Sequence, residues 1–239
     1  MIPRALPRIA PLPGLSLLFA LALATTGCNL AATPSVAAPL PDPTLDTPNA
    51  ASQHEQVAVL AGGCFWGLQA VFEHVKGVHK VWAGYAGGSA DTAQYERVGD
   101  GDTGHAESVK VVFDPAKVSY GQLLKVYFSV AHDPTELNRQ GPDSGTQYRS
   151  EIFYTSEQQH DVARAYVAQL SAAKAFADPI VTKIAPLPAF YPAEAYHQDY
   201  ARLHPDNMYI VYNDAPKVEQ LKRQFPSLYQ SEPVRIDAK

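Results

Sequence analysis

The chain is predicted to fold as a two-layer α/β protein, and three observations carry this prediction. Short apolar runs typical of strands occur along the chain, and longer segments with the 3.6-residue period of amphipathic helices separate them. Glycines and prolines stand at the junctions, where turns are needed. The 239 residues, of which 46% are apolar and 18% charged, suffice for one domain of ordinary globular composition plus appendages.

The first half of the domain is predicted to run strand, helix, strand, strand. The first run is short and apolar, and Gly62-Gly63 closes it as a turn. In the helix that follows, Trp66 and Ala70 recur at helical spacing, whereas the last strand alternates and places Val109 and Val111 on one face. The expected ranges are 56–61 for the first strand, 65–75 for the helix, and 78–85 and 107–113 for the next two strands.

The second half begins with an amphipathic helix, a strand and a long helix that Ser156 caps. Three prolines between residues 186 and 192 argue against regular structure there. The expected ranges are 120–130 for the helix, 149–154 for the strand, 156–173 for the capped helix, 180–184 for a further strand, and 193–202 and 216–225 for two final helices. The order strand, helix, strand, strand, helix, strand predicts a ferredoxin-like two-layer α/β sandwich core with added helices and long loops.

The first 27 residues have the pattern of an export signal. Arg4 and Arg8 precede an apolar stretch over 15–24, which is short for a membrane span, and small residues follow it. Cys28 comes directly after them, as in the lipobox of bacterial lipoproteins, where this cysteine is lipidated and becomes the mature N-terminus. Thr25 departs from that pattern because Leu is usual there. The alternatives are an ordinary signal peptide with a chance cysteine, or an uncleaved anchor.

Four segments are therefore expected: a lipoprotein-like signal peptide over 1–27, an Ala/Pro/Thr-rich tether over 28–54, the folded domain over 55–229 and a flexible tail over 230–239. The expected location is the cell envelope, in the periplasm and anchored by lipid. Asn29 is not Asp, which by resemblance to sorting rules favours the outer membrane.

Composition also excludes several classes of function. The net charge is −5 without a basic block, so nucleic acid is not an expected partner. The two cysteines, Cys28 and Cys64, are too few for a disulfide scaffold or a four-cysteine zinc site. His105 and Glu107 have the spacing of a deaminase zinc motif, but no Cys-x-x-Cys completes it, so no metal is assigned.

Cys64 is the candidate nucleophile. It lies where a strand ends and a helix begins, so the exposed backbone N–H groups and the helix dipole favour a thiolate there. Phe65 and Trp66 follow directly and offer an apolar wall beside the sulfur. The alternative interpretation is a buried structural cysteine next to two core aromatic residues.

Over about Val57 to Tyr200, the chain resembles a known family, the A-type peptide methionine sulfoxide reductases. The segments that carry the resemblance are Gly63-Cys64-Phe65-Trp66-Gly67, Gly84-Tyr85-Ala86-Gly87-Gly88, Gly104-His105-Ala106-Glu107, His132-Asp133-Pro134-Thr135, Asn138-Arg139-Gln140-Gly141-Pro142-Asp143, Gly145-Thr146-Gln147-Tyr148-Arg149-Ser150, Phe190-Tyr191-Pro192-Ala193-Glu194 and Tyr196-His197-Gln198. The resemblance implies an enzyme that repairs oxidised methionine by returning the sulfoxide to the thioether.

The resemblance implies a role for each matching residue. Cys64 would attack the sulfoxide sulfur and become a sulfenic acid as methionine leaves. Glu107, in an apolar context that suggests burial, would supply a proton to the sulfoxide oxygen. Tyr95 and Tyr148 would hydrogen-bond that oxygen, and Asp143 would organise water or the tyrosines. The alternatives are a solvated or paired carboxylate at Glu107 and simple packing at Tyr148.

Phe65 and Trp66 would hold the methyl group of the substrate, and the resemblance implies the S epimer of the sulfoxide. His197 is interpreted as structural rather than catalytic.

The chain departs from many members of that family because no cysteine follows Cys64. The hypothesis is that an external thiol, a thioredoxin-like protein or a small thiol, reduces the sulfenic acid directly, with no other cofactor. The expected partners are proteins that contain methionine sulfoxide, the thiol donor and the membrane, and a monomer is expected. Two rival functions stay open: a cysteine peroxidase, and a non-catalytic envelope lipoprotein that binds exposed methionines or partners.

Overall fold

Six strands form the central sheet of the protein, whose computed structural model describes residues 39–47 and 55–236. In spatial order they are β7 (Lys183–Pro186), β6 (Glu151–Tyr154), β1 (Gln56–Ala61), β3 (Ala106–Phe113), β2 (Val78–Ala86) and β8 (Phe190–Pro192). Neighbouring strands are antiparallel except for β6 and β7, which are parallel. A separate two-stranded pair joins β4 (Arg139–Gln140) to β5 (Asp143–Ser144).

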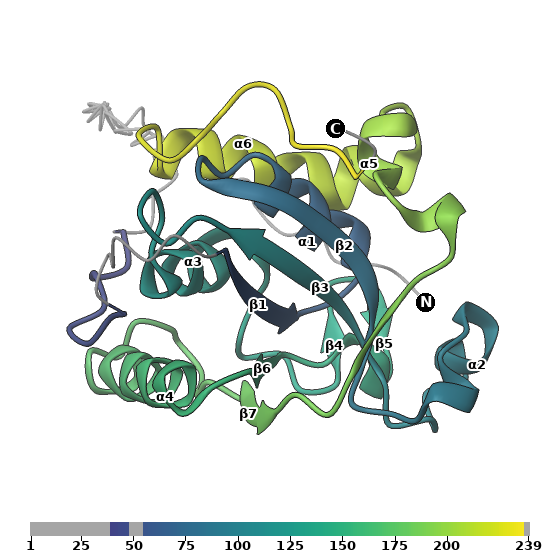
Figure 1. Ribbon diagram of the computed structural model, residues 1–239, viewed down its shortest axis with the longest axis horizontal. Helices are drawn as coiled ribbons and strands as arrows, with labels where there is room; N and C mark the ends of the chain where they lie inside the picture. The colour runs from purple at the N-terminus through teal and green to yellow at the C-terminus, as the bar shows by residue number, and fades with distance from the viewer. Residues whose placement is uncertain (1–38, 48–54, 237–239) are drawn as a thin grey trace, which may run out of the picture. The chain divides into compact units, whose positions relative to one another are not determined.

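The helices supply the second layer. They are α1 (Phe65–Glu73), α2 (Tyr95–Gly99), α3 (Tyr120–Val126), α4 (Glu157–Ala172), α5 (Tyr200–Leu203) and α6 (Ala215–Gln224). Figure 1 shows α6 beside α1 and α4 beside α3, and both pairs are in contact. The main core lies between these helices and one face of the sheet, and Leu68, Leu123 and Val111 are fully buried in it. Burial of each such side chain contributes roughly 2 kcal/mol.

The predicted fold class is confirmed. The segments β1, α1, β2, β3, α3 and β6 follow one another along the chain, and their strands lie in the spatial order β6, β1, β3, β2. Strands β7 and β8 extend this core at its two edges. The predicted alternation in β3 is also correct, because Val109, Val111 and Phe113 are buried in the main core.

The expectation that residues 186–192 are irregular is correct only for 187–189, because the ends of the segment belong to strands. Pro186 ends β7 opposite Tyr154, and Pro192 ends β8 opposite Gly84. Both strands lie at the edges of the sheet, where a proline needs no partner for the N–H that it lacks. The strand expected at 180–184 begins only at Lys183.

The continuous helix expected over 193–202 is interrupted. A short 3₁₀ turn spans Ala195–His197, and α5 begins at Tyr200. Between them, the Gln198 side chain hydrogen-bonds to both backbone groups of Ala83, and Asp199 has a φ of 53°. A helix does not pass through a left-handed residue, so tertiary hydrogen bonds override the local preference here.

Part of the segment assigned to the tether packs on the domain. Within residues 39–47, the Asp46 side chain accepts hydrogen bonds from the Ser119 hydroxyl and from the backbone N–H of Gly121 at the start of α3. The Tyr166 hydroxyl donates to the Pro41 carbonyl at 2.9 Å. An acidic side chain at a helix N-terminus accepts from its unpaired N–H groups, which the composition of the segment did not reveal.

Part of the segment predicted to be a flexible tail is hydrogen-bonded to the end of α1. The backbone N–H of Gln230 donates to the His74 carbonyl, and that of Val234 donates to the Glu73 carbonyl. These bonds satisfy carbonyls at the end of α1 that the helix leaves unpaired.

The predicted signal peptide and Cys28 lie outside the described residues, as do 28–38 and 48–54 of the predicted tether. Within residues 39–47 and 55–236, no helix is both long enough and apolar enough to cross a bilayer.

Candidate active site

Cys64 lies between β1 and α1, in the turn that the glycine pair was expected to make. Gly63 has a φ of +91°, in the left-handed region that favours glycine. Cys64 is the N-cap residue of α1, is 8% exposed and carries a free thiol. It is the one cysteine within the part of the chain that the structure describes. The sequence therefore placed the candidate nucleophile correctly at a strand-to-helix junction.

The expectation that this junction favours a thiolate is wrong because the thiol is buried. Burial raises the pKa of the Cys64 thiol well above its ordinary value, and the carboxyl groups of Glu107 and Asp214 raise it further. The hydrogen bond from the backbone N–H of Trp66 lowers the pKa, but these other effects outweigh it. The thiol is thus neutral near pH 7.

Glu107 approaches Cys64 from β3, the strand that pairs with β1. It is 3% exposed, and its Oε2 accepts a hydrogen bond of 3.0 Å from the backbone N–H of Phe65. Burial raises the pKa of Glu107 to about 8, although the Phe65 hydrogen bond opposes this rise. The expected burial of Glu107 is confirmed, and its carboxyl group is largely protonated at neutral pH.

Tyr95 and Tyr148 reach the same site from two different loops. Tyr95 begins α2, and Tyr148 ends the 3₁₀ turn Thr146–Tyr148. Burial raises the pKa of Tyr95 to about 12 and that of Tyr148 still higher, and Glu107 raises both further. Both phenols also interact electrostatically with Cys64. The structure therefore places both predicted tyrosines within electrostatic range of the thiol, as neutral phenols.

Asp143 lies on β5 and joins the site through a tyrosine that no sequence motif singled out. The Tyr209 hydroxyl donates a short hydrogen bond to Oδ2 of Asp143. Both residues line a cavity of about 70 Å³ together with Cys64. Asp143 thus accepts a hydrogen bond from a phenol, but the phenol is Tyr209 and not one of the two predicted tyrosines.

The two predicted aromatic residues differ in exposure. Phe65 is fully buried in the main core, 5.8 Å from the ring of Tyr85, whereas Trp66 is half-buried. The indole of Trp66 stacks on Tyr200 at 3.9 Å and meets the ring of Tyr209 edge-on. Trp66 is therefore the more accessible part of the expected apolar wall.

His197 supports the indole of Trp66 through a hydrogen bond. The indole Nε1–H of Trp66 donates to Nδ1 of His197 at 3.2 Å, so the proton of the neutral imidazole is on Nε2. Burial lowers the pKa of His197, which keeps the ring neutral. The ring centroid also lies 4.3 Å from that of Tyr95. These contacts fit the structural role expected for His197.

Glu194 connects two parts of the site that are distant in sequence. Its Oε1 accepts from the backbone N–H of Tyr95, and its Oε2 accepts from the Tyr85 hydroxyl. Sequence reasoning missed Glu194, Tyr200 and Tyr209 as site residues. Glu194 and Tyr200 stand in or close after a motif of the family resemblance and Tyr209 lies beyond it, and only contacts across the fold distinguish them from surface residues.

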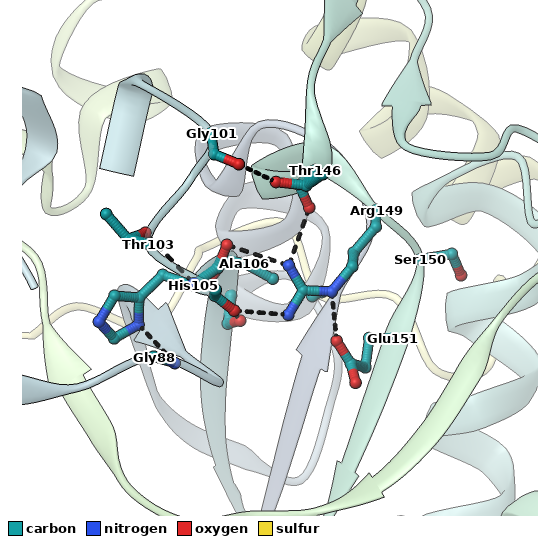
Figure 2. A network of polar contacts seen from close by, with 12 residues as sticks. Gly88, Gly101, Thr103, His105, Ala106, Thr146, Arg149, Ser150 and Glu151 are labelled. Carbon is teal, nitrogen blue, oxygen red and sulfur yellow. Dashed lines mark hydrogen bonds and ion pairs between the residues drawn. The ribbon is translucent and has the colours of Figure 1, made fainter. Parts of the chain in front are cut away.

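A buried arginine joins the segment that precedes β3 to the 3₁₀ turn that carries Tyr148 (Figure 2). The guanidinium of Arg149 donates to the carbonyls of Gly104 and His105, which precede β3, and to the Thr146 carbonyl. It also forms an ion pair with Glu151, and both side chains are nearly buried. Arg149 therefore holds the start of β3 and the 3₁₀ turn of Tyr148 in one arrangement.

Within the described residues, no group of three or more His, Cys, Asp or Glu side chains is arranged to hold a metal ion.

Comparisons with known proteins show which family the chain resembles. A family model described as peptide methionine sulfoxide reductase matches residues 56–228. "Peptide methionine sulfoxide reductase MsrA 2" of Mesorhizobium japonicum is 59% identical over 78% of this chain and 95% of its own length. The protein of the same name from Synechocystis is 50% identical over 78% and 88%.

Solved structures give the same result. The reduced form of Mxr1 from Saccharomyces cerevisiae matches with a TM-score of 0.57 and 33% identity, over 64% of this chain and 87% of that one. Methionine sulfoxide reductase A of Corynebacterium diphtheriae matches with a TM-score of 0.56 and 34% identity, over 70% and 84%.

Proposed function

The chain belongs to the peptide methionine sulfoxide reductase family, and we propose that it reduces the S epimer of methionine sulfoxide, free or in proteins, through a sulfenic acid on Cys64. It is an oxidoreductase of that family. The single observation that carries the assignment of residues is the buried carboxyl of Glu107, which accepts a hydrogen bond from the backbone N–H of the residue that follows Cys64.

In the proposed first step, the sulfur of Cys64 attacks the sulfoxide sulfur and the S–O bond breaks. Glu107 donates its proton to the sulfoxide oxygen, and the thiol proton of Cys64 returns to the Glu107 carboxylate. The oxygen released from the substrate sulfur then bonds to the Cys64 sulfur as the S–S bond between the two sulfurs breaks, so the products are methionine and Cys64 sulfenic acid and no atom is lost. The raised pKa values of both groups support a reaction that starts from the neutral thiol and the neutral acid.

Tyr95 and Tyr148 are proposed to hydrogen-bond the sulfoxide oxygen as negative charge develops on it. Phenols with pKa values above their usual range keep their protons and donate without transferring them. Trp66, supported by Phe65, is proposed to hold the substrate methyl group. With the methyl group on one side and the acid groups on the other, one sulfoxide epimer fits.

The second step is proposed to use an external thiol, such as thioredoxin. Two thiols reduce the sulfenic acid to Cys64 thiol and release water and a disulfide. No cysteine follows Cys64 in the chain, which supports regeneration from outside. One turnover without reductant, followed by mass spectrometry of the intact chain, tests this step: a sulfenic acid is expected, and a disulfide between Cys28 and Cys64 contradicts it.

The function as a whole is tested with chiral methionine sulfoxide and dithiothreitol. The full chain is expected to turn over the S epimer, and Cys64→Ser is expected to be inactive. Hydrogen peroxide as an alternative oxidant separates this function from that of a cysteine peroxidase. Faster turnover of peroxide than of the sulfoxide, or unchanged sulfoxide turnover by Cys64→Ser, overturns the proposal.

We also propose that this activity repairs oxidised proteins in the cell envelope, with the chain anchored by lipid on Cys28, in the outer membrane. The support is the signal-like pattern of residues 1–27 and the position of Cys28 directly after it. Metabolic labelling with a fatty acid tests the anchor. Label is expected on the wild-type chain and absent from Cys28→Ser, and label that survives the substitution contradicts it.

A further inference from the structure

An ion pair that the proposed mechanism does not use lies next to Cys64. Nζ of Lys217 donates to Oδ1 of Asp214 at 3.2 Å, at the start of α6. Asp214 is fully buried, and the Lys217 side chain is 19% exposed. Oδ2 of Asp214 is buried and has no hydrogen-bond partner within the described residues. Burying two charges is unfavourable unless they are paired, so the location of this pair calls for an explanation.

The ion pair of Asp214 and Lys217 lies against the first turn of α1. A Cβ added to Gly67 would overlap Oδ1 of Asp214 and would lie 2.8 Å from Nζ of Lys217. Residue 67 must therefore be glycine for the two charged groups to approach the helix backbone. Cys64 is the N-cap residue of that same turn, so α1 holds the thiol and the ion pair at one place.

Lys217 and Cys64 line the same small cavity. Its volume is about 70 Å³, and Asp143, Tyr209 and Asn213 contribute to its walls. A water molecule occupies about 30 Å³ of liquid, so the cavity has room for roughly two waters or for the oxygen of a Cys64 sulfenic acid. Within the described lining residues, Lys217 is the one that carries a positive charge.

We propose that Lys217 is the proton donor for the regeneration of Cys64, and this rests on the proposed function. An external thiolate attacks the sulfur of the Cys64 sulfenic acid, and the S–O bond breaks. The ammonium of Lys217 gives a proton to the departing oxygen, which leaves as water. A mixed disulfide between Cys64 and the donor forms, and solvent returns the proton to Lys217. A second donor thiol then releases Cys64.

Reduction of the Cys64 sulfenic acid by the external thiolate needs a nearby cation more than the reduction of the sulfoxide does. The attacking thiolate is negative and enters a site that already holds the carboxyl groups of Asp143 and Asp214, both of which interact electrostatically with Cys64. Hydroxide is a poor leaving group, so protonation of the oxygen in the transition state lowers the barrier. Asp214 holds the ammonium at the cavity and thereby acts as its positioning residue.

The experiment measures the two half-reactions separately in the full chain. Rapid mixing with excess methionine sulfoxide gives the burst of methionine, and mixing of the pre-formed sulfenic acid with dithiothreitol gives the rate of regeneration. For Lys217→Met we expect regeneration to slow by about 100-fold, as for loss of a general acid, and the burst to slow much less. Lys222→Met, on the exposed side of the same helix, is the control and is expected to keep both rates.

A second variant separates proton donation from charge alone. Lys217→Ala opens space beside the cavity, and added methylammonium is expected to restore part of its regeneration rate. Tetramethylammonium carries the same charge but no proton to donate, and it is expected to restore nothing. Circular dichroism and thermal unfolding check that each variant is folded.

The outcomes distinguish the two proposals. If the wild-type chain gives no methionine burst, the proposed function fails. If the burst is present but Lys217→Met regenerates at the wild-type rate, or if both half-reactions slow equally, this inference is wrong and the proposed function stands. Equal rescue by both ammonium ions also overturns the proton-donor role.

Discussion

The backbone N–H of Phe65 donates a hydrogen bond of 3.0 Å to Oε2 of Glu107, which joins the first residue of α1 to β3, one of the two central strands of the sheet. The first N–H groups of a helix have no partner within it, and here a buried carboxyl group accepts one of them. The same bond holds that carboxyl group beside Cys64. One contact thus caps the helix and positions the proposed acid.

The first prediction concerns Glu107→Gln. The amide keeps the hydrogen bond from Phe65 but has no acidic proton, so we expect the methionine burst to slow by about 100-fold or more, with little loss of stability. The burst rate and the urea midpoint of the variant measure the two effects. Glu194→Gln tests a carboxyl group that holds Tyr95 rather than the reacting oxygen, and it is expected to reduce the burst less.

The pH dependence of the burst gives a second prediction. With the pKa of Glu107 at about 8, the acid is protonated below this pH and loses its proton above it. We therefore expect the burst rate to be level below about pH 7 and to fall up to tenfold per pH unit above about pH 8. Glu107→Gln should lack this decline. A burst rate that instead rises through pH 8 would mean that thiolate formation on Cys64 limits the step.

His197 provides a third prediction. Replacement by Phe keeps an aromatic ring under Trp66 but removes the acceptor of its indole N–H, and a lost hydrogen bond of this kind is worth about 1 kcal/mol. We expect KM for the sulfoxide to rise about fivefold, with kcat changed less, because the wall binds the substrate and does not move its protons. His160→Phe, remote on α4, is the control. A loss confined to kcat would assign His197 a chemical role instead.

Arg149 is central to the fourth prediction. Arg149→Met leaves the nearly buried carboxylate of Glu151 unpaired, so we expect a loss of roughly 3–5 kcal/mol in the free energy of unfolding. The double variant Arg149→Met, Glu151→Gln should lose less, because no charge is left buried. Urea unfolding of both variants and the wild type measures this difference. Equal losses in the single and double variants would show that the hydrogen bonds to Gly104 and His105 dominate.

The fifth prediction concerns stability and pH. Burial and the neighbouring Asp199 raise the pKa of Glu73 to about 10, from an ordinary value near 4.5. Because the folded state holds this proton more tightly, its contribution to stability is complete below about pH 4.5 and is lost as pH rises toward 10, by at most about 1.4 kcal/mol per pH unit.

We expect Glu73→Gln to flatten this slope between pH 5 and 9, since its amide donates to Asp199 without titrating. Urea unfolding at several pH values measures the slope. Glu219→Gln, which replaces an exposed carboxylate on α6, should keep the wild-type slope. An unchanged slope in Glu73→Gln would show that other buried carboxyl groups account for the pH dependence.

Much of the fold could be predicted because the signals for strands and helix caps depend on residues that are close in sequence. The apolar run 56–61 and the cap at Ser156 depend on neighbours in sequence, and β1 and α4 begin where these signals place them. The edge strand β8 was missed and β7 was placed three residues too early, because their pairing depends on β2 and β6 rather than on their own residues. The break at Asp199 was missed for the same reason, since Gln198 bonds to a strand more than 100 residues away.

By itself, then, the sequence determined the order of elements, the position of Cys64 at the start of a helix, and the motifs that predicted its chemistry. Only the tertiary structure decided the electrostatics of the site. Helix position alone favours a thiolate at Cys64, but the fold buries it with Glu107 and Asp214, and both effects raise its pKa. Burial and the approach of distant charges depend on three-dimensional packing, so no local pattern encodes them. The same packing brought Tyr209 to Asp143 and Lys217 to the cavity beside the thiol.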